Sequence, residues 1–168
     1  QEKIYILGHS FGTYIAINAA RNHPDKYLAY LAVSQIADQR KSEEMAYDYM
    51  VEQYRDRGSR MVEKFEKYDI HNSGDDFKAY NTSGLRDKAM HELGIGTTRD
   101  MKSVITGIFF PSLRCRTYTI GERFNFWKGK ILSNSFAVTS ESFNYNTFEN
   151  ISELKIPVYF FAGEYDYT

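Results

Sequence analysis

A short motif near the start of the chain has the residue types and the spacing that nucleophilic catalysis by serine requires. The sequence GHSFG at residues 8–12 matches the pattern G-x-S-x-G. It follows residues 3–7, which predict a buried strand, and it opens residues 11–22, which predict a helix. A nucleophile elbow, the sharp strand-to-helix turn that exposes a reactive serine hydroxyl, has this context. The alternative is a serine in an ordinary turn between a strand and a helix.

Each residue of the predicted elbow has an expected role. The turn would hold Ser10 in a strained backbone conformation and lift its hydroxyl clear of the sheet. Gly8 and Gly12 would flank it because a Cβ at either position is expected to collide with a neighbouring strand or helix. The helix N-terminus favours negative charge, and the amide of Phe11 would point to the place where an oxyanion forms. We therefore predict that Ser10 is a nucleophile and that Phe11 contributes to an oxyanion hole.

The elements around this motif predict a parallel sheet. Residues 27–36 form a second apolar stretch and predict another buried strand. A strand, a helix and a strand within about thirty residues predict parallel strands joined by a right-handed crossover. The small residues Gly12, Ala16, Ala19 and Ala20 would let the helix lie close to this sheet.

A mostly helical segment of about 110 residues separates these elements from a third predicted strand at 156–162. Its predicted parts are helices at 41–57, 59–68, 85–93 and 98–110 (ended by Pro111), partial helix at 117–136, and a polar stretch at 74–84 that predicts a loop or short turns. An insertion of this kind normally lies at the carboxyl ends of parallel strands, where ligands bind. We therefore divide the chain into a core part at 1–37, a helical cap at 38–150 and an acid-bearing strand region at 151–168.

A carboxylate follows the third predicted strand. Asp166 lies just past the carboxyl end of that strand, from which a side chain can reach the crevice that contains the elbow. There it would hold a histidine in the productive tautomer and stabilise its cation. Glu164 is a weaker candidate for the same role. The alternative for Asp166 is a solvated turn residue.

These residues resemble the α/β-hydrolase superfamily at both ends of the chain. GHSFG and its helix, HPDKY at 23–27, and IPVYFFAGEYDYT at 156–168 are similar to the central part of that fold, and more narrowly to its proline-iminopeptidase-like branch with a helical cap. The resemblance implies an α/β fold with a nucleophile at Ser10, an oxyanion-hole amide at Phe11 and a triad acid at Asp166. It also implies an ester or a small peptide or amide as substrate, an acyl-enzyme intermediate and no cofactor.

One part of the family pattern is missing, because the order Ser, acid, His requires a histidine after Asp166. Only Tyr167 and Thr168 follow that residue. We therefore interpret the chain as a fragment that lacks the triad histidine and predict that it is inactive by itself. The four histidines have other expected roles: His9 is the variable residue of the motif, His23 caps a helix end, and His71 and His91 face solvent in the cap.

Two alternatives to an active hydrolase stay open. The chain is compatible with a catalytically inactive α/β-hydrolase-like domain used for binding, and with a truncated product that has no activity of its own. A histidine on a loop soon after Asp166 in the complete protein would favour the enzyme. In addition, a sheet of three strands would leave the edge of the first strand open, so we predict that the isolated chain either associates with itself through that edge or is never made alone.

Composition excludes several classes of protein. The 21 basic and 22 acidic residues of the 168-residue chain nearly cancel, so no basic field favours nucleic acid. The single cysteine, Cys115, excludes an internal disulfide framework, and His91-Glu92 lacks the second histidine of a zinc motif, so we expect no metal. No apolar run reaches the ~18 residues of a membrane span. We predict a soluble, cytoplasmic protein whose partner is a small-molecule ester or peptide.

Overall fold

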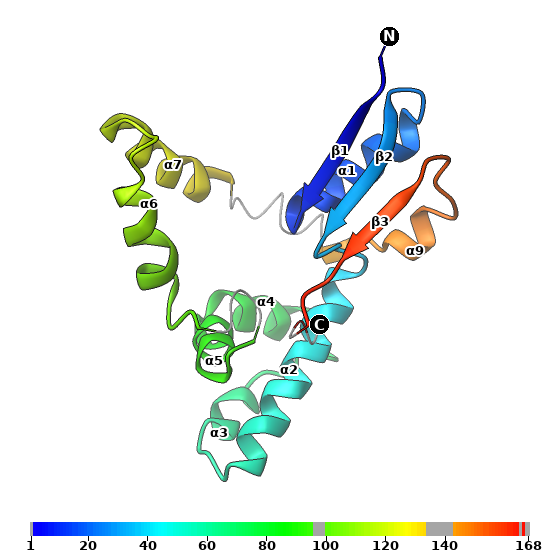
Figure 1. Ribbon diagram of the computed structural model, residues 1–168. Coiled ribbons are helices and arrows are strands. Elements are labelled where there is room, and N and C mark those ends of the chain that lie inside the picture. The colour runs from blue at the N-terminus through cyan, green and yellow to red at the C-terminus, as the bar shows by residue number, and fades with distance from the viewer. Residues whose placement is uncertain (1, 96–99, 134–142, 165, 167–168) are drawn as a thin grey trace. The chain divides into compact units, whose positions relative to one another are not determined.

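The computed structural model divides the chain into two units (Figure 1). The core unit consists of Gln1–Lys41 and Phe136–Glu164, and the helical unit consists of Ser42–Ser135 and Tyr165–Thr168. The residues that the structure describes are 2–95, 100–133, 143–164 and 166.

The core unit contains a parallel sheet of three strands, as the sequence predicts. Strands β1 (Ile4–His9), β2 (Tyr27–Val33) and β3 (Val158–Phe161) lie in the order β1-β2-β3. Both pairings are parallel. Strand β2 ends three residues earlier than the prediction because Ser34 has a positive φ of 51°, which an extended strand does not allow.

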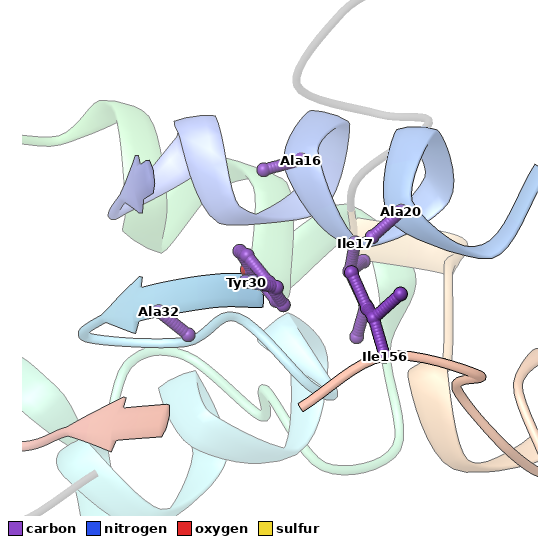
Figure 2. Close-up of a cluster of buried hydrophobic side chains, with 6 residues drawn as sticks. All are labelled: Ala16, Ile17, Ala20, Tyr30, Ala32 and Ile156. Carbon is purple, nitrogen blue, oxygen red and sulfur yellow. The ribbon is translucent and has the colours of Figure 1, made fainter. Parts of the chain in front are cut away.

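Helix α1 (Phe11–Asn22) packs on one face of this sheet and forms the core with it (Figure 2). Its buried face consists of Thr13, Ala16, Ile17 and Ala20, which recur at helical spacing. The predicted small-residue stripe is therefore wrong for two members, since Gly12 and Ala19 are only partly buried. The small side chains on the true face leave room for the fully buried ring of Tyr30 from β2.

The C-terminus of α1 confirms the expected role of His23. This residue is the C-cap, and its backbone N–H donates to the carbonyl of Ala19 at 2.9 Å. Pro24 follows directly and disfavours helix at the residue before it.

The other face of the sheet carries large exposed apolar side chains. Tyr5 and Leu7 on β1 are 67% and 63% exposed, and Tyr159 and Phe161 on β3 are 56% and 51% exposed. Within the described ranges, β1 and β3 each pair with β2 alone. Parallel sheets normally have both faces covered, so this face and these edges are available to further polypeptide.

The helical unit contains most of the remaining helices. They are α2 (Gln39–Asp56, whose first residues belong to the core unit), α3 (Val62–Phe65), α4 (Gly74–Thr82), α5 (Leu85–Leu93), the π-helix η1 (Ile105–Phe109), α6 (Phe110–Arg114) and α7 (Ile120–Ser133).

Two predictions for this unit are wrong. The stretch at 74–84, expected to form a loop or short turns, is largely helix α4, because the Ser73 hydroxyl caps its N-terminus by accepting from the Asp76 amide at 3.1 Å. The expected helix at 98–110 does not end at Pro111, since proline lies in the first turn of α6, where a missing N–H is tolerated. Residues 98 and 99, at the expected start of this helix, lie outside the described residues.

The histidines of the helical unit differ from each other. His71 is exposed, and its Nε2 lies 2.8 Å from an Asp48 carboxylate oxygen. His91 is only partly exposed, and its Nδ1 is buried with no hydrogen-bond partner among the described residues. The prediction that both face solvent is therefore correct only for His71.

The two segments that connect the sheet to the insertion lie together in the core unit. We call residues 34–38 the outgoing linker and residues 145–147 the returning linker. Asp38 and Asn146 form an antiparallel bridge, and the Thr147 amide donates to the Ala37 carbonyl at 2.7 Å. The returning linker continues into α9 (Thr147–Asn150). Residues 145–150 thus group with the core, whereas the division from the sequence assigned them to the cap.

Candidate active site

The backbone of Ser10 has the strained conformation that the elbow requires. Ser10 joins β1 to α1 as the N-cap residue of the helix, with φ 51° and ψ −123°. A type II′ turn has this geometry at its first central position, which usually takes glycine. A serine there costs on the order of 1–3 kcal/mol. The residue is exposed, so the strained turn presents it at the surface of the core unit.

Backbone hydrogen bonds hold this turn from both sides. The Ser10 amide donates to the Val33 carbonyl at the end of β2 at 3.0 Å. The Ser10 carbonyl accepts from the Thr13 amide at 2.9 Å. The neighbouring strand and the first turn of α1 therefore fix the position of Ser10 together.

The two glycines of the motif are not equivalent. A Cβ on Gly8 would lie 2.7 Å from the Cα of Thr13 and 2.8 Å from the Gly12 carbonyl oxygen, so only glycine fits between β1 and α1. A Cβ on Gly12 would meet no described atom within 4 Å. The expected collision is correct for Gly8 and wrong for Gly12, because Gly12 lies off the buried face of α1.

The start of α1 suits negative charge next to Ser10. Phe11 is the first residue of the helix, and the first turn contains no acidic side chain that would offset the positive end of the helix dipole. The Phe11 amide belongs to this turn. Its role in an oxyanion hole stays a prediction.

Thr13, which is not among the site residues predicted from the sequence, is fully buried beneath the turn. Its hydroxyl donates to the Ser10 carbonyl at 2.5 Å and accepts from the Ile36 amide at 3.0 Å. The sequence does contain an indication of this role, because helical spacing places the polar Thr13 on the same face of α1 as the apolar Ala16, Ile17 and Ala20. A buried hydroxyl at such a position needs hydrogen-bond partners.

The proposed acid and the proposed nucleophile belong to different units. Asp166 is exposed and follows β3 in the chain, but it belongs to the helical unit. Glu164 is also exposed and belongs to the core unit. Among the described residues, no hydrogen bond joins the Ser10 hydroxyl to a histidine, so the triad assignment stays a prediction.

Two further features are absent from the part of the chain that the structure describes. No group of three histidine, cysteine or acidic side chains there is arranged to hold a metal ion. None of the described helices is both long and apolar enough to span a membrane.

The sequence of the chain is similar to sequences of known proteins. The sequence model of the alpha/beta hydrolase fold family matches residues 1–167, so the chain belongs to that family. The fold class predicted from the sequence is therefore confirmed.

A curated bacterial protein is also similar. The chain is 23% identical over 168 residues to the probable aminopeptidase YbaC of Bacillus subtilis (strain 168). The match covers 99% of this chain and 51% of the relative, so the chain spans about half the length of that protein. No solved structure matches the chain.

Proposed function

We propose that the complete protein is a serine hydrolase in which Ser10 is the nucleophile. The observation that supports this most directly is the exposed Ser10 at φ 51°, in a strand-to-helix turn where Gly8 cannot be larger. Residues in sparsely populated backbone conformations cluster at active sites, because strain persists only where the surroundings enforce it.

In the proposed reaction, the Ser10 hydroxyl loses its proton to a base and its oxygen attacks a carbonyl carbon. The carbonyl oxygen becomes an oxyanion, which the Phe11 amide would stabilise. The carbon–oxygen or carbon–nitrogen bond to the leaving group then breaks as that group takes up the proton, which leaves an acyl-enzyme. Water hydrolyses the acyl-enzyme and regenerates Ser10.

The base is assigned to a histidine outside these 168 residues, because none of the four present follows the acid as the family order requires. Asp166 would orient that histidine. The helical unit would act as the cap over the substrate. A peptide with a free amino terminus is the preferred substrate class because the relative is named a probable aminopeptidase, and an N-terminal proline is one option.

Labelling with a fluorophosphonate tests this proposal. Protein made from the complete gene should gain the mass of one phosphonyl group, and the Ser10→Ala variant should gain none. Well-folded protein that is not labelled would contradict the enzyme and favour the alternative, an inactive hydrolase-like binding domain. Hydrolysis of aminoacyl anilides, compared with simple esters, would then separate an aminopeptidase from an esterase.

We also propose that the 168-residue chain alone associates with itself through the open edge of β1. Exposed apolar residues line this strand, and an unpaired edge is a template for another strand. Light scattering of the chain is expected to give a mass well above 19.6 kDa.

A variant with a charged side chain on β1 tests whether this strand mediates the association. Leu7→Lys places a lysine at a position that is 63% exposed and should shift the chain toward smaller species. A monodisperse, stable monomer of the unmodified chain would contradict the proposed association.

A further inference from the structure

The hydroxyl of Thr13 joins the nucleophile turn to the outgoing linker. Thr13 has no exposed surface, and a hydroxyl offers one hydrogen to donate and lone pairs to accept. It donates to the Ser10 carbonyl at 2.5 Å and accepts from the Ile36 amide at 3.0 Å. Ser10 and Ile36 are therefore held by one side chain, although 26 positions of sequence separate them.

A second contact connects the same two segments. The Tyr30 hydroxyl lies 3.1 Å from the Thr13 carbonyl oxygen and 2.6 Å from Oε1 of Gln35. The Gln35 amide nitrogen in turn donates to the Ile36 carbonyl at 2.7 Å. Burial raises the pKa of Tyr30 to about 12, so its hydroxyl keeps its proton and remains a donor at neutral pH.

These contacts continue to the returning linker within the core unit. The Thr147 hydroxyl donates to the Ile36 carbonyl at 3.3 Å, and the Thr147 amide donates to the Ala37 carbonyl at 2.7 Å. The outgoing linker is thus held on one side by Thr13 and on the other by Thr147. A continuous set of hydrogen bonds runs from the base of the insertion to Ser10.

We propose that Thr13 is a positioning residue that keeps Ser10 in its reactive conformation. The proposal rests on the proposed function of Ser10 as the nucleophile. A strained backbone persists only where the surrounding structure holds it, and the Ser10 carbonyl accepts from both the amide and the hydroxyl of Thr13. Removal of the hydroxyl would break its bond to this carbonyl and its bond from the Ile36 amide. The Ser10 hydroxyl would then no longer be oriented toward the carbonyl carbon, and small displacements of a nucleophile lower the reaction rate strongly.

The test compares three variants of the protein made from the complete gene. Thr13→Val keeps the shape of the side chain and removes the hydroxyl, whereas Thr13→Ser keeps the hydroxyl and removes the methyl group. Ile17→Val is the matched control, because Ile17 is buried on the same face of α1 and its hydrocarbon side chain forms no hydrogen bond. For each variant we would measure kcat, KM, the rate of Ser10 labelling, unfolding, and hydrogen exchange at the Ile36 amide.

Thr13→Val is expected to lower kcat and the labelling rate by about 10- to 100-fold with little change in KM, since the hydroxyl acts on the nucleophile and not on substrate binding. Thr13→Ser should recover most of the rate, and Ile17→Val should lose stability without losing rate. Exchange at Ile36 should accelerate in Thr13→Val alone. The comparison of kcat with stability is informative because a residue with only a structural role would change stability without lowering kcat at constant KM.

Two results would overturn the inference separately from the proposed function. If Thr13→Val retains the labelling rate of Ile17→Val, Thr13 does not position Ser10. If even the unmodified protein is not labelled, the proposed function fails, and exchange at Ile36 becomes the deciding measurement. Protection at Ile36 that is unchanged in Thr13→Val would then show that this hydroxyl does not hold the turn.

Discussion

Replacing Ser10 with glycine is expected to abolish hydrolysis and at the same time to make the protein more stable. Loss of a serine nucleophile lowers kcat by about 10⁴-fold or more. The same change removes the Cβ at φ 51° and releases strain on the order of 1–3 kcal/mol. Glycine also raises the conformational entropy of the unfolded chain, which offsets about 0.4–1 kcal/mol of this stabilisation. The net expectation is a rise of about 1 kcal/mol in the free energy of unfolding.

Ser10→Ala is the control that separates the two effects. Alanine also lacks the nucleophile, but it keeps the Cβ, so activity should be lost while stability stays within about 0.5 kcal/mol of the unmodified protein. Urea unfolding of the three proteins, beside hydrolysis assays, measures both quantities. If glycine and alanine give equal stabilities, the turn does not store strain at Ser10.

Replacing Gly8 with alanine is expected to be among the most damaging single changes in the core unit. The added methyl carbon would lie 2.7 Å from the Cα of Thr13, 2.8 Å from the Gly12 carbonyl oxygen and 2.9 Å from the Thr13 amide nitrogen. All three are backbone atoms, so α1 must move away from β1 as a whole. We expect a loss of about 3 kcal/mol in the free energy of unfolding, together with loss of activity, because Ser10 lies between the two displaced elements.

Gly12→Ala gives a matched comparison within the same motif. No described atom comes within 4 Å of a Cβ at this position, and alanine favours helix over glycine by up to about 1 kcal/mol. Thermal or urea unfolding should therefore show Gly12→Ala to be neutral or more stable. If Gly8→Ala and Gly12→Ala lower the free energy of unfolding equally, the close approach of α1 to β1 is not the reason for glycine at position 8.

The sequence alone predicts the part of the fold that depends on local patterns. The apolar run before Gly8 and the helix after Ser10 define β1 and α1, and the short connection to the next apolar run implies parallel pairing. The strained serine follows from the motif, because the turn between these elements needs a positive φ. Helix α4 was also within reach, since Ser73 and Asp76 have the spacing of a helix cap.

Other features depend on partners that are distant in the sequence and could not be predicted from local patterns. The role of Thr13 requires Ile36, and the end of β2 depends on the conformation of Ser34, whose amide donates to the Phe161 carbonyl at 2.9 Å. The returning linker looks like part of a helical segment until the contact of Asn146 with Asp38 is known. In each case a long-range hydrogen bond decides the structure, and no periodicity in the sequence encodes it.

The bridge between the two linkers has a consequence for how such a protein can change during evolution. Because Asp38 and Asn146 are paired, everything between them is a loop whose ends already meet. The entropy of closing such a loop grows only slowly with length, by about 0.6 kcal/mol for each doubling. The insertion can therefore lengthen, shrink or be exchanged for a foreign segment without a change in strand register. The insertion can diverge in this way while the strained turn at Ser10 is inherited intact.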